Sequence, residues 1–244
     1  MSPSPDLELP AAAGRPRHTP RPAAAAHAAR TAAWALGVLA DPGRRPPAVV
    51  HPLGFLCFPL LRAPGIGVCV HVWLPQRAEY APTLATTTVH AHSWDLLSYV
   101  VQGRIGNELV RAEPAAEAEA THRVYEIRSA QGADAVVPTA LCVRCAREEI
   151  RYTDAGGVYA LPGGEFHSSV VEDGAGAATV LLADSRGGRD RALGPLRPGG
   201  APGRVARRHA PAALARLAAQ TVLELAAPAP APATRGPEEP WRSR

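Results

Sequence analysis

Short apolar runs separated by proline and glycine fill the middle of the chain, from Val49 to Asp184. Some alternate apolar and polar residues, as in Gly67–Leu74 (GVCVHVWL), and others are continuously apolar, as in Ala178–Asp184 (ATVLLAD). Alternation is typical of a strand with one buried face. We count about nine such runs, and runs this short favour an antiparallel sandwich or small barrel over alternating strands and helices.

One helix is expected before this region and one after it. The first, from Pro22 to Leu39, is rich in alanine and stops before Asp41-Pro42-Gly43. The second has apolar residues at helical spacing, and we expect it to dock on the domain or to bind a partner. The expected organisation is a disordered segment at 1–21, a helix and connection at 22–48, a β-domain at 49–184, a linker at 185–208, a helix at 209–227 and a disordered tail at 228–244.

Composition narrows the possible partners. The net charge of +4 comes from arginines that are scattered along a chain without lysine, which argues against a nucleic-acid surface. No apolar run is long enough to span a membrane, and no signal peptide is recognised. Four cysteines are too few for a disulfide scaffold of this length. We therefore expect a cytoplasmic protein whose partner is a small molecule.

His90 and His92 are separated by one residue in the run TTTVHAH. In a strand, such residues point to the same face, so both imidazoles can bind one ion. The pair alone is weak evidence, because two histidines at this spacing also occur on ordinary strands. A metal site needs a further ligand from elsewhere in the chain.

The run GGVYALPGGEFH supplies that ligand. It resembles the second motif of the cupin superfamily (Gly, five residues, Pro-x-Gly, two residues, His), with Gly156, Pro162, Gly164 and His167 in the motif positions. The resemblance covers residues 49–184. It implies an all-β fold, a cupin-type double-stranded β-helix (jelly-roll) barrel with flanking helices at both ends.

The first cupin motif (His-x-His, three or four residues, Glu, six residues, Gly) is matched by His90, His92 and Gly103. Leu96 occupies the position of the glutamate. The resemblance implies that His90, His92 and His167 converge on one metal ion inside the barrel. A cupin that binds no metal and uses the histidines as polar filling is the alternative, although burying three unpaired imidazoles is costly.

The missing carboxylate points to a class of substrate. Three neutral imidazoles leave the charge of a divalent ion uncompensated and three coordination positions open. Such a site favours a substrate that brings its own negative charge, above all a thiolate that chelates with a neighbouring amine while O2 takes the third position. This pattern resembles the thiol dioxygenases, which are cupins with three histidines. The resemblance implies Fe(II), with other divalent transition metals as alternatives.

We therefore expect a non-heme iron oxygenase that uses O2 to oxidise L-cysteine or a related amino-acid thiol. Specialised (natural-product) metabolism, for example formation of a sulfonamide, fits this expectation. The alternatives are a metal-dependent cupin isomerase, lyase or decarboxylase, and a non-catalytic cupin that binds a small molecule. Cupins are often dimers, so the flanking helices are a candidate homodimer interface.

Candidate substrate contacts follow from strand parity and from charge. Counting from His92 predicts that Leu96, Ser98, Val100 and Gln102 face the lumen. A bulge would turn Asp95 towards the metal, but an aspartate there is more typical of a turn or a supporting residue. The candidate substrate-binding residues are His71, Trp73, Asp95, Ser98, Gln102, Arg104 and Tyr159.

Several candidates have a second explanation. His71 is as readily explained as a satisfied core histidine. A guanidinium can grip a substrate carboxylate through two hydrogen bonds, and Arg62 and Arg123 are as suitable as Arg104 for this role.

Cys142 and Cys145 form a CxxC pair within an alternating run. A zinc site there would need two more ligands, for which Cys57 and Cys69 are candidates. The strand-like setting instead favours free cysteines that act as small apolar residues.

Overall fold

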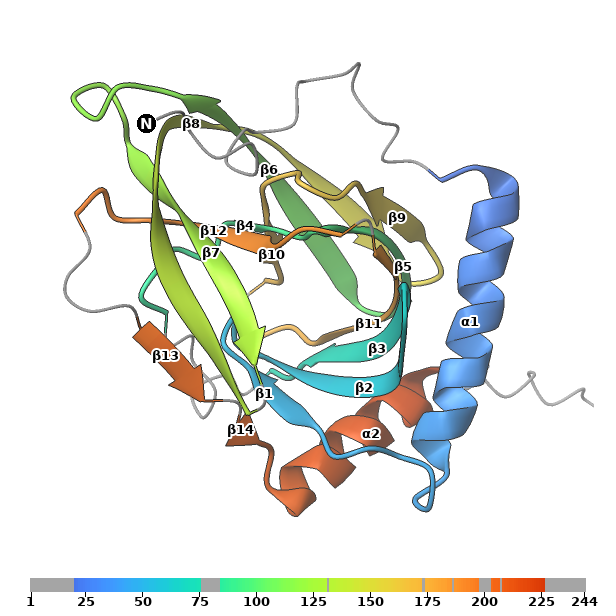
Figure 1. The fold of residues 1–244 in the computed structure, drawn as a ribbon. Coiled ribbons are helices and arrows are strands. Elements are labelled where there is room, and N and C mark those ends of the chain that lie inside the picture. Colours follow the sequence, from blue (N-terminus) through green and yellow to red (C-terminus); the bar gives the residue numbers. More distant parts are fainter. Residues whose placement is uncertain are drawn as a thin grey trace, which may run out of the picture.

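The computed structural model describes residues 20–75, 84–130, 132–172, 174–185, 187–197, 203–206 and 208–226. Strands dominate, in two antiparallel sheets with two helices packed outside one of them (Figure 1). The disordered segments expected at 1–21 and 228–244 lie outside the described residues, apart from residues 20 and 21. The elements are α1 (Pro22–Ala40), β1 (Val49–His51), β2 (Phe55–Ala63), β3 (Ile66–Trp73), β4 (His90–Ala91), β5 (Trp94–Gln102), β6 (Arg104–Pro114), β7 (His122–Ala130), β8 (Ala133–Asp154), β9 (Val158–Leu161), β10 (His167–Val170), β11 (Ala177–Ser185), β12 (Asp190–Gly194), β13 (Gly203–Ala206), β14 (Arg208–His209) and α2 (Ala212–Ala226).

Eight of these strands have the connectivity of a jelly roll. The first sheet contains the order β3-β11-β5-β9, and the second contains β4-β10-β6-β8. If β7 is left out and these eight strands are numbered from one to eight along the chain, the first sheet has the order 1-8-3-6 and the second has the order 2-7-4-5. That order is a double Greek key, the arrangement found in cupins. The fold class predicted from the sequence, a cupin-type jelly-roll barrel with flanking helices, is confirmed.

The second sheet closes on itself through its longest strand. β8 pairs with β6 along one part and with β7 along the other, and β7 connects back through β12 to β4. β12 and β13 lie within residues 185–208, where the sequence predicts a linker. β12 matters most for the site, since it pairs with the strand that carries His90.

Both flanking helices form where the sequence predicts them. Pro22 occupies the first turn of α1, where its missing N–H costs nothing, and the helix stops because Asp41 precedes a proline. The carboxylate of Asp41 accepts a hydrogen bond from the backbone N–H of Gly43 at 2.9 Å. None of the described helices combines the length and the apolar character that crossing a membrane requires.

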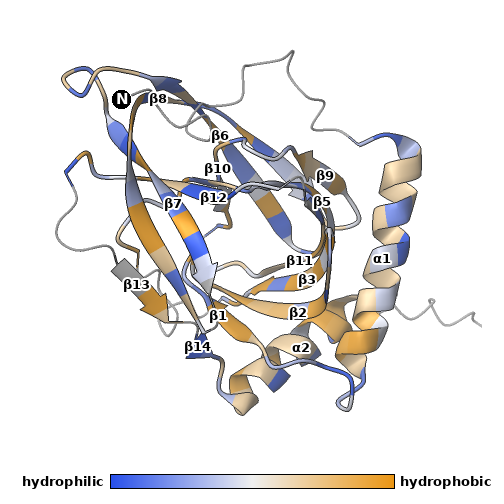
Figure 2. Ribbon diagram, viewed as in Figure 1, coloured by the Kyte–Doolittle hydropathy of each residue, from blue (hydrophilic) through white to orange (hydrophobic). Residues whose placement is uncertain are grey.

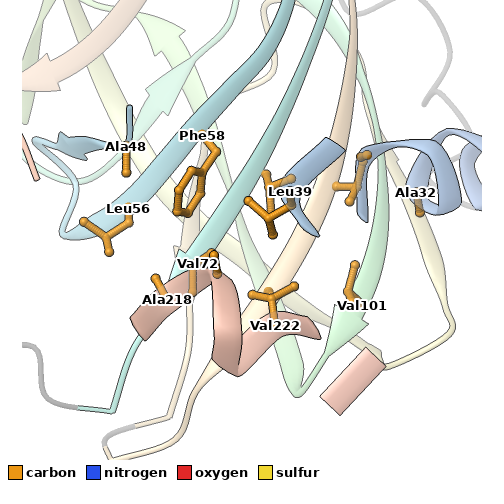
Figure 3. Packing of buried hydrophobic residues seen from close by; sticks show 14 of the residues in the cluster. Ala32, Leu39, Ala48, Leu56, Phe58, Val72, Val101, Ala218 and Val222 are labelled. Atoms are coloured by element: carbon orange, nitrogen blue, oxygen red, sulfur yellow. The ribbon is translucent and has the colours of Figure 1, made fainter. Parts of the chain in front are cut away.

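Alternation in β3 separates two hydrophobic clusters. Val68, Val70 and Val72 face the helices, where α1 and α2 contribute residues such as Leu39 and Val222 (Figure 3). Figure 2 shows this region as hydrophobic on β2 and on the half of α1 near α2. Cys69, His71 and Trp73 have the opposite parity and face the space between the sheets, here called the lumen.

Candidate metal centre

His90, His92 and His167 converge in the second sheet. Backbone pairing places His167 of β10 directly opposite His90 of β4. Their imidazole centroids are 4.4 Å apart, and the His92 centroid lies 4.8 Å from that of His90 and 5.3 Å from that of His167. One ring nitrogen from each of the three lies within 4.8 Å of the others. The three histidines are thus close enough together to hold one metal ion.

Hydrogen bonds orient two of the rings. Nδ1 of His90 is 3.0 Å from the carbonyl oxygen of Thr88, and Nδ1 of His167 is 3.0 Å from that of Glu165. Donation from Nδ1 to a carbonyl leaves Nε2 with a free lone pair, the usual state of a metal-ligating histidine. Nδ1 of His92 is buried without a hydrogen-bond partner among the described residues. Since a buried polar atom without a partner is costly, the donor set fits a bound cation.

Burial keeps these imidazoles neutral. It lowers the pKa of His167 to about 3, with the neighbouring His90 acting in the same direction. Burial also places the pKa of His92 well below its usual value, and the surrounding imidazoles add to this shift. The pKa of His90 is lowered by burial as well, against the hydrogen bond to Thr88. Neutral imidazole is the form that binds a metal.

Backbone hydrogen bonds tie the two histidine motifs together. The N–H of Gly164 donates to the carbonyl oxygen of His92 at 2.7 Å. The N–H of Gly163 donates to a carboxylate oxygen of Asp95 at 2.9 Å. Asp95 therefore supports the turn before His167, and it belongs to no metal-ligand group among the described residues.

A surface hollow of about 480 Å³ reaches the edge of this site. His92 and Asp95 line it together with Arg189 and Arg191, which come from the loop before β12 and from β12 itself. Arg189 also pairs with Glu126 at 2.9 Å. The hollow thus joins a metal-ligating candidate to two cationic side chains.

A buried polar group lies deeper in the lumen. Ser98 and Tyr159, both predicted from the sequence, face each other across β5 and β9. Asn107 and Thr179 lie near the same tyrosine hydroxyl. The oxygen atoms of Ser98, Asn107 and Thr179 are buried, and none completes a hydrogen bond of normal geometry with a described residue. Burial also raises the pKa of Tyr159. Asn107 and Tyr159 line a smaller hollow of about 130 Å³.

Aromatic packing surrounds His71 on the facing sheet. Its ring centroid lies 4.6 Å from that of Phe55 and 6.0 Å from that of Trp73. Phe55 also stacks on His51 at 4.2 Å. His51 and His71 also contribute to the lowered pKa of His92.

The arginine candidates lie in different places. Arg104 is on the outer surface, where it pairs with Asp154 at 3.4 Å and stacks on Tyr152. Arg123 donates to the carbonyl oxygens of Thr139 and Leu196 and thus holds loops together. Neither is brought to the histidines.

Arg62 and Gln102 have less defined positions. Arg62 is exposed near the end of β2, and its charge acts on Cys57 and Cys69. Gln102 is half-buried at the end of β5, next to a register shift between Ala178 and Thr179.

The cysteines group differently from the CxxC hypothesis. Cys142 and Cys145 join no metal-ligand group among the described residues, whereas Cys57 and Cys69 cluster with His71. The zinc site considered around the CxxC pair is therefore not formed.

Sequence reasoning also missed Asn107, Thr179, Asp190 and Arg191. Thr179 is the polar residue of an otherwise apolar stretch of β11, and parity places it on the same face as Leu181 of the lumen cluster. Asp190 and Arg191 belong to β12, which has no strand-like pattern of its own.

No protein-family model and no curated protein matches the chain. Among solved structures, a cupin-2 domain protein from Shewanella frigidimarina is 10% identical over 53% of this chain and 79% of its own, with a TM-score of 0.29. The polyketide cyclase RemF from Streptomyces resistomycificus is 17% identical over 61% and 75%, with a TM-score of 0.33. Hydroxypropylphosphonic acid epoxidase from S. wedmorenis is 14% identical over 59% and 56%, with a TM-score of 0.33. Similarity at this level transfers no residue role to the chain.

Proposed function

We propose that this chain is a non-heme Fe(II)-dependent cupin oxygenase that oxidises a small anionic substrate, with L-cysteine or a related amino-acid thiol as the first candidate. The observation that carries the proposal is a ligand group of three neutral imidazoles, His90, His92 and His167, that includes no carboxylate. Fe(II) held by such a group would supply O2 activation and an uncompensated positive charge. A thiolate substrate would compensate that charge.

The chain's own residues would bind the rest of the substrate. Ser98, Asn107 and Thr179 present buried oxygen atoms that still need hydrogen-bond partners. A substrate amine or carboxylate can meet this need, and its binding would then depend on a polar group as well as on the metal. The hollow beside His92 would admit the substrate, and Arg189 and Arg191 would favour an anionic one.

Apolar and aromatic residues would exclude water from the reacting groups. Trp94 stacks on the His92 ring with a centroid distance of 4.0 Å. Leu96, which replaces the usual glutamate, is 5% exposed and lies in the lumen cluster with Val100. An anionic substrate therefore meets a low-dielectric surface, where its attraction to a cation is stronger than in water.

Oxygen consumption tests the proposal directly. The chain, reconstituted with Fe(II) without air, is mixed with O2 and a panel of thiols, amino acids and 2-oxo acids. We expect uptake with a cysteine-like thiol, and product mass would distinguish a sulfinate from a sulfonamide. His167→Ala should abolish uptake, whereas His122→Ala, at a half-buried histidine on β7 outside the ligand group, should not.

Absence of uptake with every compound would contradict the proposal. Turnover without O2 would instead indicate an isomerase, lyase or decarboxylase. Stoichiometric ligand binding without turnover would indicate a binding protein. The homodimer expected through the flanking helices stays a prediction.

A further inference from the structure

A second cluster of metal-ligating side chains lies on the sheet that faces the three histidines. Cys57 on β2 and Cys69 and His71 on β3 place two sulfur atoms and one ring nitrogen within 4.8 Å of one another. Strand register produces this cluster, since Cys57 is opposite His71 and Pro59 is opposite Cys69. Cys57 and Cys69 are therefore diagonal neighbours on the lumen face.

The two cysteine side chains interact with each other in the lumen. A hydrogen bond from Cys57 lowers the pKa of Cys69 to about 5, with His71 and Arg62 acting in the same direction and burial against it. The same hydrogen bond raises the pKa of Cys57 well above its usual value. The two sulfur atoms thus lie close enough to interact with each other. A metal ion that displaces the thiol protons would be bound by two thiolates, the usual consequence of metal binding to cysteine.

We propose that Cys57, Cys69 and His71 form a second metal site, selective for a soft divalent ion such as Zn²⁺ and distinct from the three-histidine site. Thiolate and imidazole are the ligands that zinc prefers, and two thiolates neutralise its charge in a buried place. Three protein ligands leave a fourth position for water or a ligand thiolate. The proposal requires neither iron nor an oxygenase reaction, so it stands apart from the proposed function.

Distances and packing support a preformed site. Tetrahedral zinc, with Zn–S near 2.3 Å and Zn–N near 2.0 Å, places its donor atoms about 3.5 to 3.8 Å apart. Donors that already lie within 4.8 Å need only a small closing movement. Phe55 and Trp73 pack around His71 and restrict its ring, while Cys57 is only 8% exposed. Such an apolar shell limits the access of water to the ion.

Cobalt and zinc loading can test this site independently of activity. The full chain is reduced, freed of metal with a chelator and titrated with Co²⁺, and thiolate-to-cobalt charge-transfer absorption and bound metal are measured. We expect about two ions per chain and a charge-transfer band. Cys57→Ser and Cys69→Ser should lose the band and one ion. Cys145→Ser, at a half-buried cysteine outside the cluster, should keep both, and His167→Ala should lose an ion but keep the band.

Peptide mapping of the unaltered chain covers the case in which a serine variant does not fold. Zn²⁺ should protect Cys57 and Cys69, but not Cys145, from alkylation by iodoacetamide. The proposal is overturned by a wild-type chain without the charge-transfer band, by a Cys57–Cys69 disulfide that persists under reducing conditions, or by alkylation that Zn²⁺ does not slow. His167→Ala separates the two hypotheses, because it removes only the three-histidine site.

Discussion

Asp190 accepts two hydrogen bonds from Ser93, one from the backbone N–H at 2.7 Å and one from the hydroxyl at 3.0 Å. Ser93 directly follows His92, and Asp190 begins the strand that pairs with His90. A single carboxylate therefore fixes the segment that carries two of the three histidines. It belongs to no ligand group among the described residues, so its contribution to the three histidines is to hold this segment in place.

Replacing Asp190 by alanine should weaken metal binding without removing a ligand. Loss of a group that orients a ligand typically lowers affinity about 10- to 100-fold. Competition with a coloured chelator measures the Co²⁺ affinity of the three-histidine site in a Cys69→Ser background. The control is Asp154→Ala, at an exposed carboxylate that pairs with Arg104 on the outer surface. Equal affinities in the two variants would contradict a positioning role for Asp190.

Gly103 should tolerate no side chain, as its place in the first motif suggests. Its φ is +72°, and a Cβ would lie 2.2 Å from the carbonyl oxygen of Gly176. Gly65 has a similar φ of +80° but open space around it. Gly65→Ala should therefore cost only the left-handed backbone penalty of about 1 to 2 kcal/mol, and Gly103→Ala should cost more than about 3 kcal/mol. Urea unfolding of the two variants makes the comparison.

The three-histidine group could be predicted because strand parity places His90 and His92 on one face and the resemblance of two short motifs to cupins adds His167. The pairing of β10 with β4 that sets His167 opposite His90 follows from neither motif's local geometry. Asp190 and Asn107 could not be placed in this way. Their positions depend on the pairing of strands that are distant along the chain, and β12 has only five residues with no alternation.

The cluster of Cys57, Cys69 and His71 could be predicted from the sequence only in part. Cys69 and His71 share a face by parity, so two of the three residues can be recognised in the run GVCVHVWL. The position of Cys57 depends on the hairpin register, which a shift between Pro59 and Leu61 displaces. A one-residue error in this register would point Cys57 to the helices, which is why spacing alone cannot reveal the cluster.

Removing the hydroxyl of Tyr159 should affect substrate binding more than stability. In Tyr159→Phe, the oxygens of Ser98, Asn107 and Thr179 lose a neighbour in the lumen. Because Tyr159 is one of the residues expected to bind the substrate, we expect KM to rise about tenfold, the effect of losing one hydrogen bond to a charged group.

Tyr125→Phe is the matched control, because its hydroxyl donates to the carbonyl oxygen of Pro195 at 2.9 Å and does not belong to the polar group around Tyr159. This variant should lose about 1 kcal/mol of stability and keep its KM. An unchanged KM in Tyr159→Phe would show that the polar group around Tyr159 does not bind the substrate.

Restoring the carboxylate at Leu96 tests the central argument about charge. Leu96 is 5% exposed in the lumen, so Leu96→Glu places an anion where the metal-free chain has no means to solvate it. Metal should therefore raise the Tm of Leu96→Glu by more than that of the wild type. The new carboxylate would also compensate the charge that a thiolate otherwise compensates, so KM for the thiol should rise at least about tenfold. Leu96→Gln, of the same shape without the charge, should show neither effect. A glutamate variant that binds metal more tightly but keeps its KM would show that substrate charge is not what the three-histidine site selects.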